Sequence, residues 1–420
     1  MRRPGSAHPP GGNQGGVEAV DIEAIERAAR TVAGPARRTP VLEPRGLAER
    51  LGGRVALKAE CLQATGSFKV RGAFAALAAL GDDELAAGVV AASAGNHAQG
   101  VAAAAREAGA PADIFMPAEA PLAKVDAVRE LGARVELVPG GFAEAEAAAE
   151  RFARERGAAL VPPFDHPAVI AGQGTIGLEI ADQVPDARLV LVPVGGGALA
   201  AGTAIAVKSR LPGARVVGVR AQNLESSGAR RTICDGIAVK RLGRITGPLV
   251  EEWVDELVEV SDDEVAEAMV LLLERAKLVV EGAGAVGVAA LLSARVAPAA
   301  EGATCVVVSG GNVDPTRLAE CIAMGETAAG RRLVVSVVMP DRPGALARLL
   351  ATVAERGANV VDVEHVREGL DLHVGETGIT LVLQTRGREH SAELERAIAE
   401  AGFVRRPAAL PSSVVNPSER

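Results

Sequence analysis

The stretch LVPVGGGALAAG (191–202) runs from a β-branched segment through three glycines into an Ala-rich helical segment. The same order recurs in VVAASAGNHAQG (89–100) and VVVSGGNVDPTRLAE (306–320). Between about 40 and 320, β-branched runs alternate with helical stretches. Because strands alternate with helices, the sequence predicts crossover units and an α/β fold whose parallel sheets are buried on both faces.

The loops of these three stretches predict an anionic ligand. In open α/β sheets, ligands bind outside the carboxyl ends of the strands, where helix N-termini present N–H groups and a partial positive charge. Gly195, Gly197 and Ala200 match the G-x-G-x-x-A pattern of dinucleotide sites. The next strand, however, ends at Arg220 instead of the acid that would bind a ribose, so an NAD-dependent oxidoreductase is only an alternative.

A second pattern begins after residue 330. Three β-branched runs and two helical stretches follow in the order β-α-β-β-α, and FVRR (403–406) is a candidate last strand. This order is typical of the ferredoxin-like split βαβ module. We therefore expect a disordered tail at 1–19, a catalytic domain at 20–325, a ferredoxin-like domain at 331–405 and a C-terminal tail at 406–420.

Composition excludes several classes of protein. The chain has 420 residues, 45 Lys and Arg against 53 Asp and Glu, and 48% hydrophobic residues, which indicates a folded protein that does not bind nucleic acid. No apolar run reaches the roughly 18 residues of a membrane span, and no signal core is present, which predicts a cytoplasmic protein without membrane partners. The cysteines and histidines show no metal-ligand spacing, so no metal is expected.

The sequence contains six lysines, namely Lys58, Lys69, Lys124, Lys208, Lys240 and Lys277. Lys69 differs from the others because it stands at the start of a strongly apolar helical stretch, KVRGAFAALAAL (69–80). Partial desolvation there would lower the pKa of Lys69, as an imine-forming amine requires. We interpret the other five as solvated or snorkelling cations, with Lys58 in an alternating strand and Lys124 in a polar turn.

Four motifs resemble those of the serine and threonine dehydratases, a pyridoxal phosphate family of fold type II. They are SFKVRGA (67–73) for the cofactor lysine, SAGNHAQG (93–100) for the substrate loop, GGGAL (195–199) for the phosphate loop and SGGN (309–312) for the pyridine nitrogen. The region 331–405, with DRPGAL at 341–346, resembles an ACT domain. The resemblance implies two lobes with parallel sheets, as in the tryptophan synthase β fold, and a regulatory ferredoxin-like ACT domain.

The resemblance also implies a role for each matching residue. Lys69 would hold pyridoxal 5'-phosphate as a Schiff base and act as the base at the substrate Cα, with Phe68 beside the ring. Asn96 would contact the ring oxygen and Ser309 the pyridine nitrogen, and the phosphate would bind to Gly195, Gly196, Gly197, Ala198 and Leu199. The substrate would bind to Ser93, Ala94, Gly95, Asn96, His97 and Glu281.

These roles imply a threonine ammonia-lyase, which eliminates water from L-threonine and releases 2-oxobutanoate and ammonia in isoleucine synthesis or threonine breakdown. Ser309, a neutral partner for the pyridine nitrogen, favours elimination over transamination. Ala94 stands where racemase relatives carry a serine, which argues against racemisation. L-Serine is an expected second substrate because a pocket discriminates one methyl by only about 1–3 kcal/mol. An L-serine dehydratase and an inactive amino-acid sensor are the alternatives.

The ACT-like region implies regulation by an amino acid, with isoleucine or valine as the expected effector. Asp341, Arg342, Pro343 and Gly344 form a predicted turn before a helix, and Asn359 begins the next strand. ACT domains bind effectors between paired modules, which implies a homo-oligomer, either a dimer or a tetramer. A structural dimerisation module without an effector is the alternative for this region.

Overall fold

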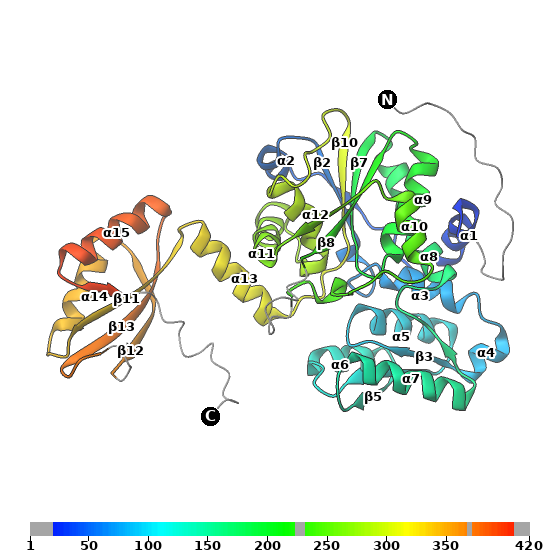
Figure 1. Cartoon of the computed structure of the whole chain (residues 1–420), viewed down its shortest axis with the longest axis horizontal. Coiled ribbons are helices and arrows are strands. Elements are labelled where there is room, and N and C mark those ends of the chain that lie inside the picture. The colour runs from blue at the N-terminus through cyan, green and yellow to red at the C-terminus, as the bar shows by residue number, and fades with distance from the viewer. Residues whose placement is uncertain (1–19, 223–231, 368–371, 407–420) are drawn as a thin grey trace. The chain divides into compact units, whose positions relative to one another are not determined.

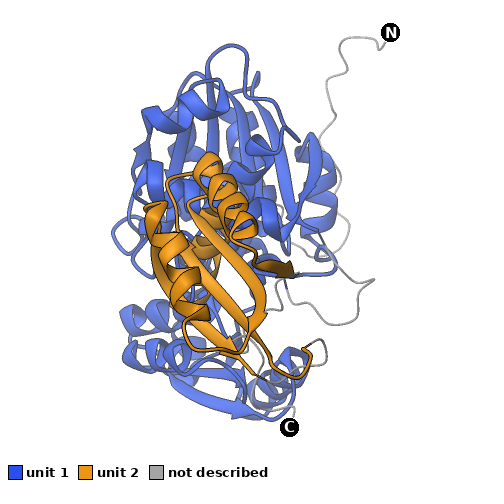
Figure 2. Ribbon diagram, turned by 90° about the vertical axis from the view of Figure 1, so that its left-hand side faces the viewer, with its two compact units in different colours: residues 1–314 blue, residues 315–420 orange. Residues whose placement is uncertain are grey.

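The computed structural model describes residues 20–222, 232–367 and 372–406. These residues form two compact units, with the boundary between Asp314 and Pro315 (Figure 2). The tail expected at 1–19 lies outside the described residues, and so does the tail expected at 406–420 apart from Arg406, which ends the short strand Val404–Arg406.

The larger sheet of the first unit has six strands in the order β1-β2-β10-β7-β8-β9. Their bounds are Val41–Leu42 (β1), Val55–Ala59 (β2), Ala303–Val308 (β10), Ala187–Pro193 (β7), Arg215–Ala221 (β8) and Glu256–Val260 (β9). All neighbours pair in parallel except β1 and β2. Helix α12 (Gly282–Leu292) lies on one face and α9 (Ala198–Arg210) on the other, so the predicted doubly covered parallel sheet is confirmed (Figure 1).

The smaller sheet has four parallel strands in the order β5-β4-β3-β6. The bounds are Arg134–Val138 (β5), Ala112–Pro117 (β4), Val89–Ala92 (β3) and Ala159–Leu160 (β6). Helices α5 (Asn96–Ala108), α6 (Leu122–Glu130) and α7 (Phe142–Arg156) connect and cover these strands (Figure 1). The two sheets correspond to the two lobes that the resemblance implied.

Helices α3 (Lys69–Leu77) and α8 (Pro167–Gln183) join the two sheets, because α3 packs against both α5 and α8. Helices α8 and α9 (Ala198–Arg210) pack closely because glycines lie where they touch. A Cβ at Gly202 on α9 would lie 2.4 Å from the Ile170 carbonyl oxygen on α8. The remaining elements of this unit are α1 (Ile22–Val32), α2 (Arg45–Leu51), η1 (Glu60–Leu62), α4 (Asp82–Ala87), η3 (Asp235–Ile237), α10 (Thr246–Trp253), α11 (Asp262–Leu271) and η4 (Leu272–Ala276).

The second unit has one antiparallel sheet in the order β12-β13-β11-β14. Its elements are α13 (Pro315–Ala328), β11 (Arg332–Pro340), α14 (Ala345–Glu355), β12 (Asn359–Val366), β13 (Glu376–Gln384), α15 (Arg388–Glu400) and β14 (Val404–Arg406). The order β-α-β-β-α-β confirms the ferredoxin-like prediction. Val335, Leu349, Leu381 and Ile398 lie in its core.

Two lysine predictions are wrong. Lys58 was expected to be solvated or snorkelling in an alternating strand, but all of β2 is buried and the Lys58 side chain is 0% exposed, because β2 lies inside the sheet between β1 and β10. Its Nζ lies 2.5 Å from Glu179 Oε2. Lys124 is in α6 instead of a turn, and its Nζ lies 3.0 Å from Asp235 Oδ2.

Within the described residues, no helix has the length and apolar character to cross a membrane.

Candidate active site

Lys69 is the first residue of α3, and its amine has a pKa close to physiological pH. Its Nζ donates a hydrogen bond to the Pro163 carbonyl oxygen at 2.8 Å and lies 5.4 Å from the centre of the Phe68 ring. Burial lowers the pKa of Lys69 to about 8, although the Glu281 carboxylate opposes this shift. A substantial fraction of this amine is therefore neutral near physiological pH, as a nucleophile or base requires.

The segment before Lys69 is tied to the loop that follows β10. The Phe68 N–H donates to the Ser309 carbonyl oxygen at 3.1 Å, and Ser67 forms an isolated antiparallel bridge with Gly310. The Ser67 hydroxyl is buried and has no hydrogen-bond partner in the described part of the chain. The structure thus brings the predicted lysine and pyridine-nitrogen motifs together and leaves an unused polar atom between them.

Asn96, the first residue of α5, is held at both ends of its carboxamide. Its Nδ2 donates to Glu281 Oε1 at 2.8 Å, and its Oδ1 accepts from Asn312 Nδ2 at 2.7 Å. Asn312 Nδ2 also donates to the Thr65 carbonyl oxygen at 2.8 Å, just before the lysine motif. Asn312 therefore links three of the four motifs, a role that its place at the end of SGGN did not reveal.

Glu281 lies beside Asn96 at the N-terminus of α12. Burial raises the pKa of Glu281 to about 7, and the Asn96 hydrogen bond and the Lys69 charge act against this shift. Only 6% of Glu281 is exposed, so its charge is expected to respond to whatever binds next to it. The predicted placement of Glu281 near Lys69 and Asn96 agrees with this geometry, while its role toward the substrate stays a prediction.

The rest of the loop at 93–97 has a fixed shape. Ser93 Oγ accepts a hydrogen bond from the Gly95 N–H at 3.1 Å, across Ala94. His97 is buried in the first turn of α5, and its Nε2 lies 2.8 Å from the Val161 carbonyl oxygen, so this nitrogen carries the proton. Burial and the nearby Lys69 charge lower the pKa of His97 to about 3. His97 is therefore a neutral anchor for the loop and not a titrating group.

The loop Gly195–Gly197 follows β7 and opens α9. A Cβ at Gly196 would lie 2.2 Å from the Phe164 ring, and Gly197 has a φ of +98° that favours glycine. Ala198 begins the helix, a conformation with negative φ that accommodates an alanine. Leu199 lies in the first turn and is buried. The result is a cradle without side chains at the N-terminus of a 13-residue helix, which suits a phosphate.

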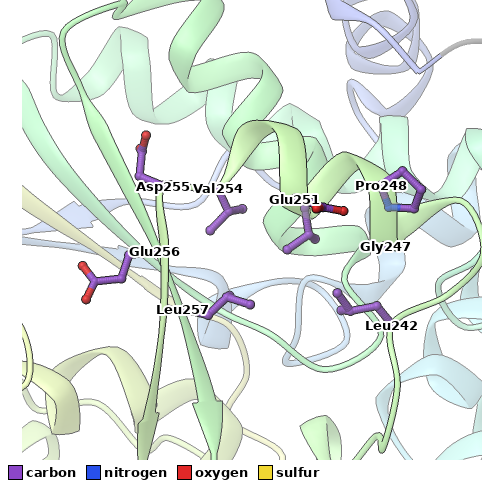
Figure 3. Close-up of a pocket in the computed structure, with 9 residues that line it drawn as sticks. Leu242, Gly247, Pro248, Glu251, Val254, Asp255, Glu256 and Leu257 are labelled. Atoms are coloured by element: carbon purple, nitrogen blue, oxygen red, sulfur yellow. The ribbon is translucent and has the colours of Figure 1, made fainter. Parts of the chain in front are cut away.

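A surface hollow of about 600 Å³ lies beside α10, as Figure 3 shows. It is lined by Leu242, Gly247, Pro248, Val250, Glu251, Val254, Asp255, Glu256 and Leu257. Asp255 is paired with Lys208 and Glu256 with Arg215. None of the predicted catalytic, cofactor or substrate residues lines this hollow.

The five predicted effector residues of the second unit divide into two groups. Asp341, Arg342, Pro343 and Gly344 connect β11 to α14, and Asp341 Oδ2 lies 3.3 Å from Arg367 Nη1. Asn359 begins β12 and aligns through Gln384 with Arg332, at the opposite end of β11. Within one module the structure does not bring Asn359 to the turn.

A buried ion cluster behind Lys69 was missed by the sequence analysis. Arg71, on α3, donates to both carboxylate oxygens of Glu60 at 2.8 Å and to both of Glu179 at 2.6 and 3.0 Å. Lys58 Nζ donates to Glu179 and to the Thr39 carbonyl oxygen at 2.7 Å. The cluster contains two cations and two anions, and Lys58, Glu60 and Arg71 are at most 1% exposed. The stretch VALKAE (55–60) contains the charged residues Lys58 and Glu60. They would have indicated a buried ion cluster only if β2 had been expected to be fully buried.

The fold and these side chains define a class: an α/β protein with a buried lysine of lowered pKa and a glycine cradle at a helix N-terminus. A family model described as "Pyridoxal-phosphate dependent enzyme" matches residues 32–311, and the ACT domain model matches residues 333–400. The chain belongs to the pyridoxal-phosphate dependent enzyme family and carries a C-terminal ACT domain. The glycine cradle, the amine of lowered pKa and the unpartnered Ser67 hydroxyl fit this cofactor.

Similar proteins agree with this assignment. An L-threonine ammonia-lyase from Thermotoga maritima is 46% identical over 91% of this chain and 98% of its own length. The crystal structure of a threonine deaminase from the organism abbreviated T.th. is 40% identical, has a TM-score of 0.65 and covers 70% of this chain and 99% of its own. The structure of maize serine racemase is 34% identical, has a TM-score of 0.68 and covers 72% of this chain and 97% of its own.

Proposed function

We propose that this chain converts L-threonine to 2-oxobutanoate and ammonia, and L-serine to pyruvate and ammonia. The observation that carries the proposal is Lys69, an amine with a pKa of about 8 that lies beside the paired Asn96 and Glu281. The likeness over nearly the whole chain to the Thermotoga maritima L-threonine ammonia-lyase supports the choice of substrate. Ala94 lies on the substrate loop where racemases use a serine, which favours elimination over the racemase activity named for the maize structure.

Each residue near Lys69 has a task in this proposal. Pyridoxal phosphate, when bound, supplies a conjugated ring that accepts the electrons left at the substrate Cα. Gly195–Gly197 and the first turn of α9 hold its phosphate, Ser309 holds the pyridine nitrogen, and Asn96 holds the ring oxygen. The Ser93–His97 loop binds the substrate carboxylate through N–H groups. These contacts orient the Cα–H bond toward Lys69 Nζ.

The reaction is a loss of water followed by hydrolysis. Lys69 Nζ takes the Cα proton, the Cβ–O bond breaks, and the hydroxyl leaves as water after it gains a proton. The released enamine takes up a proton at Cβ to become an imine, and one water hydrolyses this imine to 2-oxobutanoate and ammonia. The hydrolysis restores the water that was lost, so L-threonine gives 2-oxobutanoate and ammonia with no other reactant. Glu281, whose pKa burial raises to about 7, accepts a hydrogen bond from Asn96 Nδ2 and so helps to orient this amide.

The direct test is to purify the protein with pyridoxal phosphate and to assay L-threonine. We expect the visible absorption of a lysine-bound cofactor and equal amounts of 2-oxobutanoate and ammonia. Borohydride reduction followed by peptide mass spectrometry should place the cofactor on Lys69. A protein that forms D-serine faster than pyruvate from L-serine would instead be a racemase, and one without any cofactor would be an amino-acid sensor.

We also propose that residues 20–325 act as the catalytic domain and 331–405 as a regulatory domain for isoleucine or valine. The exposed turn at Asp341–Gly344 and the exposed Asn359 support effector binding, and they lie at opposite ends of one sheet. An effector that contacts both groups needs a second module, which agrees with a homo-oligomer. Asp341→Ala and Asn359→Ala should remove the response of the rate to added isoleucine or valine and leave the rate without effector unchanged.

A further inference from the structure

The segment Val161–His166 contacts several parts of the candidate site at once. The Val161 carbonyl oxygen accepts from His97, and the Pro163 carbonyl oxygen accepts from Lys69 Nζ. The Phe164 ring packs so closely on Gly196 that no Cβ fits there. This segment, which no motif of the sequence marked, therefore joins the lysine, the substrate loop and the phosphate loop.

The next residue of the segment, Asp165, accepts three backbone hydrogen bonds at the start of α10. Its Oδ2 accepts from the Arg244 N–H at 2.9 Å, and its Oδ1 accepts from the N–H groups of Ile245 and Thr246 at 2.8 and 3.2 Å. A Cβ at Gly243 would lie 2.3 Å from Asp165 Oδ1, so the carboxylate approaches this backbone closely. A negative charge at a helix N-terminus with three donors is a strong, directional anchor.

The anchored helix in turn holds the phosphate loop through Thr246. The Thr246 side chain is buried, and its Oγ1 accepts from the Gly243 N–H at 2.8 Å and donates to the Gly196 carbonyl oxygen at 2.6 Å. In a planar trans peptide, the carbonyl and the next N–H point in opposite directions. Fixing the Gly196 carbonyl toward Thr246 therefore turns the Gly197 N–H to the other side of the loop, away from α10.

We propose that Asp165 is a positioning residue for the phosphate loop. By holding the N-terminus of α10, it sets the Thr246 hydroxyl against Gly196 and keeps the peptide between Gly196 and Gly197 in the orientation that binds an anion. The inference rests on the proposed pyridoxal phosphate site and adds to it a support that does not touch the cofactor. Loss of Asp165 should weaken recognition of the phosphate and leave recognition of the pyridine aldehyde intact.

The test compares two probes, pyridoxal phosphate and pyridoxal, on cofactor-free protein, with binding followed by the visible absorption of the lysine-bound form. We expect Asp165→Asn to weaken pyridoxal phosphate binding about 10- to 100-fold and pyridoxal binding less than twofold. Thr246→Val should give the same selective loss, and Thr246→Ser should restore most of it. The control is Asp21→Asn, since Asp21 caps α1 through the Ala24 N–H at 2.8 Å.

Equal weakening of both probes by Asp165→Asn would mean a purely structural role and would overturn the inference, as would an unchanged affinity for pyridoxal phosphate. If Asp165→Asn does not fold, the pair Thr246→Val and Thr246→Ser decides the question by the same comparison. A wild-type protein that binds neither probe would contradict the proposed function itself. A wild type that prefers pyridoxal phosphate, with variants that keep the same preference, would contradict only the role of Asp165.

Discussion

Lys69 and Arg71 are two residues apart on α3, so their side chains leave the helix in nearly opposite directions, about 200° apart. Arg71 enters the buried cluster with Lys58, Glu60 and Glu179, where every charge has an opposite partner within hydrogen-bond distance. Lys69 Nζ donates instead to an uncharged group, the Pro163 carbonyl oxygen, at 2.8 Å. Helix α3 thus buries the Arg71 cation between two carboxylates and the Lys69 amine without a directly bonded carboxylate from the part of the chain that the structure describes.

The partners of each group determine whether its pKa moves toward or away from physiological pH. Although burial opposes it, the carboxylates of Glu60 and Glu179 raise the pKa of Arg71. Hydrogen bonds from Arg71 and Lys58 overcome burial and hold the pKa of Glu179 below its ordinary value. Burial without a bonded carboxylate lowers the pKa of Lys69 to about 8. The shifts of Arg71 and Glu179 favour their charged forms, whereas burial lowers the pKa of Lys58 in the same cluster although Glu179 opposes this shift. The Lys69 amine, which has no bonded carboxylate among the described residues, is available for chemistry.

Removing the uncompensated amine should have the largest effect on activity. We expect Lys69→Ala to lower kcat for L-threonine at least about 1,000-fold, because it removes both the attachment of the cofactor and the base at Cα. The loss of visible absorption on the purified protein is the second readout. Lys277→Ala is the matched control, since Lys277 is exposed and donates a hydrogen bond to the nearby Glu274 carbonyl oxygen. Activity in Lys69→Ala above a hundredth of wild type would disprove the assignment.

Breaking the compensated cluster should act on stability. Arg71→Met leaves the buried Glu60 without its guanidinium partner and the partly buried Glu179 with Lys58 alone, so the free energy of unfolding should fall by about 3–5 kcal/mol. Urea denaturation of the cofactor-free protein measures this change. Arg38→Met breaks an exposed pair with Asp182 and should cost at most about 1 kcal/mol. Equal losses in the two variants would show that the cluster gives no special support to α3.

The contrast in pKa predicts how cofactor capture depends on pH. Only the neutral amine attacks the cofactor aldehyde, and the neutral fraction of Lys69 rises about tenfold per pH unit until the pH reaches its pKa. Because that pKa is lowered to about 8, the initial rate of visible absorption after mixing should rise from pH 6.5 to 8 and then level off. A rate that continued to rise to pH 10 would indicate an ordinary lysine.

Asn312 should give the smallest of these effects, because it acts through Asn96. Asn312→Ala leaves Asn96 Oδ1 without its donor, which corresponds to about 1 kcal/mol, or an approximately fivefold lower kcat/KM. The absorption maximum of the bound cofactor should shift in this variant, since Asn96 is freed to rotate. Gln384→Ala in the second unit is the control. An unshifted spectrum would mean that Glu281 alone holds Asn96.

The sequence was sufficient for the features that depend on local pattern. Strand and helix alternation predicted a parallel sheet covered on both faces, and the resemblance implied its division into two lobes. The β-α-β-β-α order predicted the second unit. The four motifs identified the loops that meet near Lys69, because each loop is short and continuous in sequence. The lowered pKa of Lys69 also followed, since the apolar stretch after it showed that its helix would be buried.

Features that depend on contacts between distant segments were not predicted. The link from Asn312 to Asn96 joins residues more than 200 positions apart, and nothing at either position indicates the other. Lys58 looked solvated because an isolated strand does not show whether it lies at the edge of a sheet or inside it. Asp165 looked like a loop residue, and only the arrival of α10 in space gives its carboxylate three donors.

The placement of β10 next to β2 has a consequence for the synthesis of the chain. The strands of the smaller sheet all lie between residues 89 and 160, so a ribosome releases that sheet as one continuous piece. The larger sheet pairs Val55 on β2 with Thr304 on β10. Strand β2 therefore lacks its neighbour β10 until most of the chain has been translated. The hydrogen bond from the Phe68 N–H to the Ser309 carbonyl oxygen therefore forms only at that late step. A nascent chain stalled before residue 303 should therefore contain a folded small lobe, an exposed β2 edge and no capacity to retain the cofactor.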